Sequence, residues 1–242
     1  DHNLAGSPRL TLRALINAVK AIGVDSGAVQ ARKDKLSSSS KSRREAALER
    51  AEKAKNETPI SKAWFSRCLS DILDENTIVL SELGVDLSQM DFNHPGSFFG
   101  SPASSGLGWA LGASLGSKLA APDKTVICVV GDGSYIFGSG TATHIVSQAQ
   151  NLPVLNIVWN NGIWNAVQNA TKVGYADGYA VRNNDFAVST LSQSFQYELI
   201  CQAAGGYAER VEDPSQVPEA IQRALHAVKV EKRQALLNII GQ

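Results

Sequence analysis

Val129–Gly140 reads VVGDGSYIFGSG, an apolar run that stops at a carboxylate between two glycines. Glycines let a backbone turn sharply and approach a ligand closely. Gly133 and Ser134 can direct N–H groups at phosphate oxygens near the start of a helix. Asp132 would repel a phosphate unless a cation lies between the two charges, and Mg²⁺ is commonly shared between a carboxylate and phosphates. The stretch therefore indicates a phosphate site, a metal site or a simple turn.

A second polar turn, Asn160-Asn161-Gly162, follows another apolar run. Asn161 offers a neutral amide oxygen and Ile163 a backbone carbonyl, and both are hard oxygen ligands of the kind that Mg²⁺ prefers. Together with Asp132 they leave room for phosphate oxygens and a water. Either turn alone is a weak indication, because Gly-Asp-Gly is frequent in ordinary turns. Two such turns, each ending an apolar strand, favour a combined metal and phosphate site.

Segments with strand and helix patterns alternate around these turns. Lys124–Val130 is apolar on both faces, which is typical of a strand inside a parallel sheet. From Pro59 onward the pattern predicts an α/β fold: a doubly wound, mainly parallel sheet with helices on both faces. Ligands of such sheets bind at the carboxyl ends of the strands, so we expect the residues that matter at 82–84, 131–134 and 160–163. The expected strands are 77–83, 124–130, 154–159, 207–211 and 234–240, and the expected helices include 106–120, 140–151, 195–204 and 217–228.

The bulk composition excludes some partners. Lys+Arg and Asp+Glu both number 23 in the 242 residues, so the formal net charge is zero and there is no long-range attraction to nucleic acid or an anionic membrane. No apolar run reaches the roughly 18 residues that span a bilayer, and no secretory signal is evident at the start. The three cysteines lack C-x-x-C spacing and are expected to be reduced thiols. We expect a cytoplasmic protein that binds neither nucleic acid nor membrane.

The pairing of Gly-Asp-Gly with Asn-Asn resembles the signature of thiamine-diphosphate enzymes. In that family N-N follows G-D-G after some two dozen residues, and here 26 residues lie between Gly133 and Asn160. The resemblance covers roughly Pro59 to Gln242. It looks most like the diphosphate-binding domain of the benzoylformate decarboxylase and acetolactate synthase type, through NHPGSFFGSPASSGLGWALGASLGSKLAAPDKTVICVVGDGS. Two departures, Ser104-Ser105 for two glycines and Ala113-Ser114 for Pro-Ala, remove no ligand.

The resemblance implies thiamine diphosphate and Mg²⁺ as cofactors and assigns roles to matching positions. Leu107 would lie under the cofactor and force its two rings into a V, so that the 4′-imino group can take the C2 proton. The backbone carbonyl of Ser105 would accept a hydrogen bond from the 4′-amino group. The implied Mg²⁺ ligands are Asp132, Asn161 and the carbonyl of Ile163. The implied cofactor contacts are Gly84, Val85, Ser105, Gly106, Leu107, Gly131, Asp132, Gly133, Ser134, Asn161, Ile163 and Trp164. Trp164, Val167 and Ala170 would line the substrate pocket.

The resemblance also implies a reaction and a partner. The family suggests a lyase or carboligase acting on 2-oxo acids, by decarboxylation or acyloin-type C–C bond formation, and no flavin is expected. Such enzymes complete the site with a pyrimidine-binding half, which carries a glutamate that protonates the cofactor's N1′. We expect that half on a separate chain or a missing N-terminal part, within a homo- or hetero-oligomer that is a dimer or a tetramer.

The N-terminal quarter has a different character. Ser7-Pro8 predicts the start of a helix. The serine-rich and charge-rich segment that follows predicts a solvated linker, helical in part from Arg43 to Lys55. We expect 1–24 to be the C-terminal remnant of a preceding middle domain, 25–58 a flexible charged linker, and 59–242 the diphosphate- and Mg²⁺-binding α/β domain. The opening DHNLAGSPRL, without Met, suggests a fragment or one piece of a split or processed polypeptide.

Several alternatives stay open. GLGWALG at 106–112 nearly matches a dinucleotide fingerprint and would fit a nucleotide-binding oxidoreductase, although its glycines run G-x-G-x-x-x-G. A relative that binds the cofactor without turnover is a further possibility. Leu107 and Trp164 can also be read as ordinary packing residues. His94 and His144 invite an acid–base interpretation but fit a turn and a helix. Glu82 ends a strand and can face the cleft or be simply solvated.

Overall fold

The computed structural model describes residues 3–101 and 106–242. The chain divides into two compact units, Asp1–Ala46 and Ala47–Gln242.

The first unit contains α1 (Pro8–Ile22) and most of α2 (Ser26–Lys53). The Ser7-Pro8 start of α1 agrees with the sequence, and none of the α1 residues is buried. The helix α2 is longer than expected, since the sequence indicated a helix only from Arg43. Its serines and charged residues give no apolar stripe, so the usual helical signal is missing. Exposed pairs such as Lys41–Glu45 support the helix at i,i+4 spacing.

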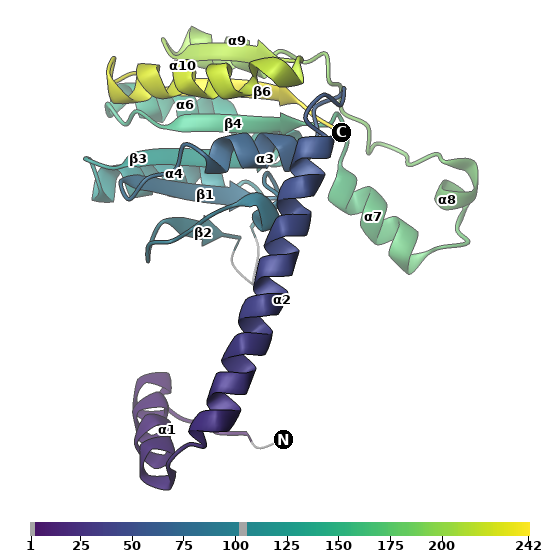
Figure 1. The fold of residues 1–242 in the computed structure, drawn as a ribbon. Coiled ribbons are helices and arrows are strands. Elements are labelled where there is room, and N and C mark those ends of the chain that lie inside the picture. The colour runs from purple at the N-terminus through teal and green to yellow at the C-terminus, as the bar shows by residue number, and fades with distance from the viewer. Residues whose placement is uncertain (1–2, 102–105) are drawn as a thin grey trace. The chain divides into compact units, whose positions relative to one another are not determined.

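The second unit is built on a six-stranded sheet in which every pairing is parallel (Figure 1). The strand order is β2-β1-β3-β4-β6-β5. All residues of β4 and β6 are buried, which explains why their sequences are apolar apart from Asn156, Asn160 and Asn238. The strands are β1 (Thr77–Glu82), β2 (Phe98–Gly100), β3 (Thr125–Gly131), β4 (Leu155–Asn160), β5 (Tyr207–Val211) and β6 (Ala235–Ile240).

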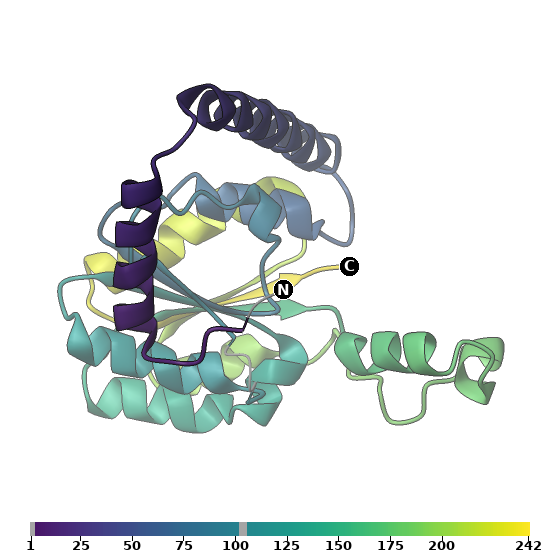
Figure 2. The same cartoon turned by 90° about the horizontal axis from the view of Figure 1, so that it is seen from below.

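Helices cover both faces of this sheet, which confirms the doubly wound α/β prediction (Figure 2). On one face, Phe65 and Ile221 belong to a core formed under α3 (Lys62–Ser70) and α10 (Val217–Lys229). On the other face, Leu111 and Cys201 belong to a core under α4 (Trp109–Ala120) and α9 (Tyr197–Ala203). The helix α6 (Gly140–Ala149) packs against α4 and α9.

Some elements were not predicted. The turn expected at Gly131–Ser134 is the first turn of a short helix, α5 (Asp132–Phe137). The helices α7 (Asn165–Gly174) and α8 (Tyr179–Asn183) follow β4, stand off the sheet in Figure 1 and contain no buried residue. The edge strand β2 was also missed. Short 3₁₀ turns occur at η1 (Leu87–Gln89) and η2 (Pro214–Gln216). Over the described ranges, no helix combines the length and apolar character needed to cross a bilayer.

Candidate functional site

A cavity of about 250 Å³ lies where the sequence placed the site, at the carboxyl ends of β3 and β4. Most of the residues implied by the resemblance line it. These are Leu107, Gly131, Asp132, Gly133, Ser134, Asn161, Ile163, Trp164 and Val167. Lys62, Leu83, Trp159, Asn165, Ala166 and Asn169 complete the lining.

Asp132 connects the two turns that the sequence singled out. Its side chain is 2% exposed, and its Oδ1 accepts a hydrogen bond from the Gly133 N–H (2.9 Å). Its Oδ2 accepts one from the Gly162 N–H on the far turn (2.8 Å). Burial raises the pKa of the Asp132 carboxyl, while these backbone hydrogen bonds act in the opposite direction. Within the described residues Asp132 forms no salt bridge, so a bound cation would supply its missing countercharge.

The second turn adds neutral oxygen atoms. The Asn161 Oδ1 accepts a hydrogen bond from the Ile163 N–H (3.2 Å), and Gly162 adopts a left-handed φ of 69° between them. One carboxylate, one amide and one carbonyl form a hard donor set that fits Mg²⁺ when phosphate oxygens complete it. No cluster of three or more His, Cys, Asp or Glu in the described ranges could hold a metal by itself. The donor chemistry therefore fits a metal shared with a phosphorylated ligand.

Gly133 is required by close packing. A Cβ at this position would lie 2.7 Å from two ring atoms of Trp164. The indole therefore rests directly on the glycine backbone, and any side chain there would displace it. The sequence placed both residues at the site but contained no sign of this contact, because it joins two separate strand ends.

The turn that carries Leu107 is fixed by Glu82 at the end of β1. The Glu82 Oε1 accepts from the Gly108 N–H (2.7 Å) and Oε2 from the Ala110 N–H (3.1 Å), so the carboxylate caps α4. Glu82 is 3% exposed, which rules out the alternative of a simply solvated carboxylate. Gly108 has φ 83°, and a Cβ there would lie 2.2 Å from the Cα of Gly138. This locked turn presents Leu107, 36% exposed, to the cavity.

The remaining sequence-predicted residues lie elsewhere. Gly84 lies against β3, where a Cβ would come within 2.8 Å of the Val129 carbonyl oxygen. Val85 packs against the core beneath α3 and α10, and Ala170 is exposed on α7. Gly106 is exposed and is not among the lining residues. Ser105 falls outside the described residues.

Neither histidine considered in the sequence lines this cavity. His94 is exposed in the loop before β2. His144 is fully buried on α6, with its Nδ1 2.6 Å from the Gln234 Oε1. Burial lowers the pKa of His144. The described geometry therefore gives neither residue an acid–base role at this cavity.

Sequence reasoning missed Lys62 and Trp159 as lining residues. Lys62 opens α3, and its neighbour Ile60 pairs with Gly241 beyond β6, which brings the start of α3 to the carboxyl edge of the sheet. No local pattern reveals such a contact. Leu83, by contrast, directly follows β1 and was among the strand-end residues that the sequence singled out.

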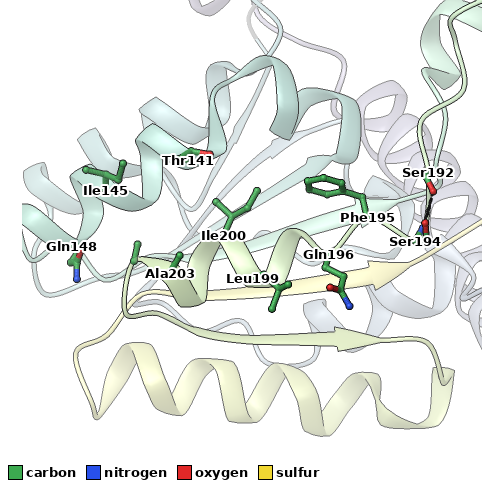
Figure 3. Close-up of a pocket in the computed structure, with 11 residues that line it drawn as sticks. Thr141, Ile145, Gln148, Ser192, Ser194, Phe195, Gln196, Leu199, Ile200 and Ala203 are labelled. Carbon is green, nitrogen blue, oxygen red and sulfur yellow. Dashed lines mark hydrogen bonds between the residues drawn. The ribbon is translucent and has the colours of Figure 1, made fainter.

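A second, larger cavity of about 770 Å³ lies between α6 and α9 (Figure 3). Its lining is largely apolar, with Ile145 from α6, Leu199 and Ile200 from α9, and Phe195 just before α9. It contains none of the residues that the sequence assigned to the site. The polar groups suited to binding a metal and phosphate are at the smaller cavity.

Comparison with known proteins places these features in a family. Residues 82–239 match the model of the thiamine pyrophosphate enzyme, C-terminal TPP binding domain; thiamine pyrophosphate is another name for thiamine diphosphate. The matched range begins at the end of β1 and includes both turns of the cavity.

Individual relatives agree with the family match. The chain is 28% identical over 181 residues to a probable acetolactate synthase of Mycobacterium bovis, covering 73% of this chain and 31% of the relative. A sulfoacetaldehyde acetyltransferase of Alcaligenes xylosoxydans is 27% identical, over 80% of this chain and 32% of its own length. A benzoylformate decarboxylase of Pseudomonas aeruginosa is 36% identical over 102 residues, which are 40% of this chain and 19% of that protein. The chain thus spans about a third of the length of the first two relatives.

A solved structure shares the fold. The thiamine diphosphate-dependent 4-hydroxybenzoylformate decarboxylase of Rhodococcus jostii superposes with a TM-score of 0.64 at 24% identity. The superposition covers 77% of this chain and 33% of that one.

Proposed function

The chain belongs to the thiamine pyrophosphate enzymes through their C-terminal TPP-binding domain, and from this premise we propose that it is the diphosphate- and Mg²⁺-binding half of a lyase or carboligase acting on 2-oxo acids. The observation that carries the proposal is Asp132. It is a buried carboxylate that joins both turns by hydrogen bonds, in a cavity that also presents amide oxygen.

Each residue then has a role toward the cofactor. Asp132, Asn161 and the carbonyl of Ile163 would hold Mg²⁺, and the metal would hold the diphosphate. The backbone at Gly133 and Ser134 would bind diphosphate oxygens. Thiamine diphosphate, when bound, supplies the carbanion chemistry that breaks or forms the C–C bond beside a carbonyl. Leu107 would support its bent conformation, and Trp164 and Val167 would face the substrate.

The proposed substrate class and partner rest on the relatives. The matches named acetolactate synthase and benzoylformate decarboxylase support a 2-oxo acid, and benzoylformate is itself one. We propose that a pyrimidine-binding half completes the site, on a separate chain or an N-terminal segment, in a dimer or tetramer. Exposed apolar side chains at the cavity support a covering surface, since Leu83 is 61% and Val167 55% exposed. A cytoplasmic location is part of the proposal, supported by three buried free cysteines.

The test is to isolate the chain with its partner and measure CO₂ release and C–C bond formation from a panel of 2-oxo acids, with Mg²⁺ and thiamine diphosphate present. We expect turnover that depends on both additions. Binding of NADH without binding of thiamine diphosphate would replace the proposal with an oxidoreductase. Tight cofactor binding without turnover in the complete complex would identify a non-catalytic relative.

A further inference from the structure

Lys62 is the only Lys, Arg or His among the described residues that line the cavity of Asp132. It is the first residue of α3 and is half-buried. Its Nζ donates a hydrogen bond to the Leu83 carbonyl oxygen (3.0 Å) and lies 5.3 Å from the centre of the Trp159 ring. Neither the sequence pattern nor the family resemblance assigned a role to Lys62.

The ammonium of Lys62 has capacity for a further ligand. An ammonium group carries three N–H donors, and in the described part of the chain its hydrogen bond is the one to Leu83. None of the ion pairs formed by described residues includes Lys62. Burial lowers the pKa of Lys62, and the nearby charge of Asp86 opposes this shift. The face of the Trp159 ring stabilises the positive charge.

Lys118 on α4 provides an instructive contrast. It is also half-buried, and burial likewise lowers its pKa. Its Nζ, however, donates to two carbonyl oxygens, those of Pro122 (2.8 Å) and Lys124 (2.7 Å). Lys118 lines neither the cavity of Asp132 nor the cavity between α6 and α9. Lys118 therefore serves the structure of its own loop. Lys62, with one carbonyl partner and a cavity in front of it, is placed to contact a ligand.

The charge of the proposed contents favours an anion as that ligand. A diphosphate ester bound with Mg²⁺ beside the carboxylate of Asp132 would remain net negative, because the diphosphate and Asp132 together carry more charge than the metal. A cation in the same cavity offsets this excess, and a charge-assisted hydrogen bond to phosphate is among the stronger polar contacts in proteins. Lys62 is the side chain able to provide both.

We propose that Lys62 is an additional ligand of the diphosphate group, donating an N–H from its Nζ to a diphosphate oxygen while the Leu83 carbonyl and the Trp159 ring hold the ammonium in place. This inference rests on the proposed function. It adds to the metal and the backbone a direct contact from a side chain outside the two turns.

Binding measurements on the full chain test this role without relying on activity. Lys62→Met removes the charge, Lys62→Arg keeps it, and Lys118→Met is the matched control for loss of a half-buried lysine bonded to carbonyls. Affinities are measured by calorimetry and by quenching of the cavity tryptophans. The probes are thiamine diphosphate with Mg²⁺, inorganic pyrophosphate with Mg²⁺, and thiamine alone.

We expect Lys62→Met to lower the affinity for both diphosphate probes by about 10- to 100-fold, the loss typical of removing a hydrogen bond to a charged group. The affinity of Lys62→Arg for the diphosphate probes should stay within about threefold of that of the unmodified chain. The affinity for thiamine alone should not change in any variant, and Lys118→Met should bind all probes like the unmodified chain. Thermal unfolding without ligand identifies a variant that has lost its fold. If Lys62→Met does not fold, the affinity of Lys62→Arg for the two diphosphate probes tests the inference instead.

Two results would overturn the inference. One is binding of both diphosphate probes by Lys62→Met within twofold of the unmodified chain. The other is a loss confined to thiamine, which would place Lys62 at the rings. Failure of the unmodified chain to bind either diphosphate probe would instead refute the proposed function, and the inference with it.

Discussion

Replacing Asp132 by Asn separates the role of this carboxylate in the fold from its role in binding a cation. Burial raises the pKa of Asp132, so the ionised form is less stable in the folded chain than in the unfolded chain. Removing the charge therefore relieves a cost when no cation is bound. The amide oxygen of Asn can accept from the N–H of Gly133 or of Gly162, but not from both. Losing one of these hydrogen bonds lowers the free energy of unfolding by about 1 kcal/mol. With EDTA present, we expect the free energies of unfolding of the unmodified chain and of Asp132→Asn to differ by no more than about 1 kcal/mol.

The two proteins should differ once ligands are added. A ligand at 100 times its Kd stabilises the folded state by about 2.7 kcal/mol, which corresponds to roughly 5–10 °C in Tm for a domain of this size. We expect that rise for the unmodified chain with Mg²⁺ and thiamine diphosphate, and none for Asp132→Asn. The assay is differential scanning fluorimetry with and without EDTA.

Asp213→Asn is the matched control for this comparison. Asp213 also accepts a backbone hydrogen bond, from the Ser215 N–H (2.9 Å), but it lies at the start of η2 and does not line the cavity. Its variant should keep the full ligand-dependent rise. A similar rise for Asp132→Asn would refute the reasoning that this carboxylate holds the cation. A large loss of stability with EDTA would show that its hydrogen bonds outweigh its buried charge.

Three further predictions test separate parts of the structure. Gly133→Ala should lower the free energy of unfolding measured in urea by about 1–3 kcal/mol, because the new Cβ would clash with Trp164. Trp164→Ala should suppress that loss in the double variant, and additive losses would contradict the contact between the two residues. Leu107→Ala should keep the rise in Tm with Mg²⁺ and thiamine diphosphate, but should slow hydrogen–deuterium exchange at C2 of the cofactor in the completed complex. Lost cofactor affinity with normal exchange would argue against a role of Leu107 in supporting the bent cofactor. Burial lowers the pKa of His144 in the folded chain below the ordinary value of about 6.5. The free energy of unfolding should therefore decrease as the pH falls from about 6.5 to the lower pKa of the folded state. His144→Gln should flatten that dependence between about pH 7 and pH 5, and an unchanged slope would exclude His144 as its source.

The sequence allowed the central strands and both site turns to be predicted because their signals are local. Lys124–Val130 is apolar on both faces, and a polar turn follows it directly, so the strand and the end that carries the ligand groups could be read together. Asp132 and Asn161 lie at the same cavity because adjacent parallel strands end at the same edge of a sheet.

Other features depend on contacts or lengths that the sequence does not display. The helix α5 has six residues, and its glycine made it look like a turn. The edge strand β2 has three residues and is not fully buried, so no alternation could develop. The first half of α2 has no apolar stripe along one face. Lys62 and Glu82 reach the site through contacts 21 and 26 residues away in sequence, to Leu83 and to Gly108.

The contact between Gly108 and Gly138 has a genetic consequence. Each glycine occupies the space that a Cβ on the other would need, 2.2 Å from the Cα of Gly138 in one direction and 2.7 Å from the Cα of Gly108 in the other. Damage from a larger residue at one position cannot be relieved by a smaller residue at the other, because that partner is already the smallest amino acid. A selection for second-site suppressors of Gly108→Ala should therefore recover no change at Gly138. The pair restricts evolutionary drift at both positions at once.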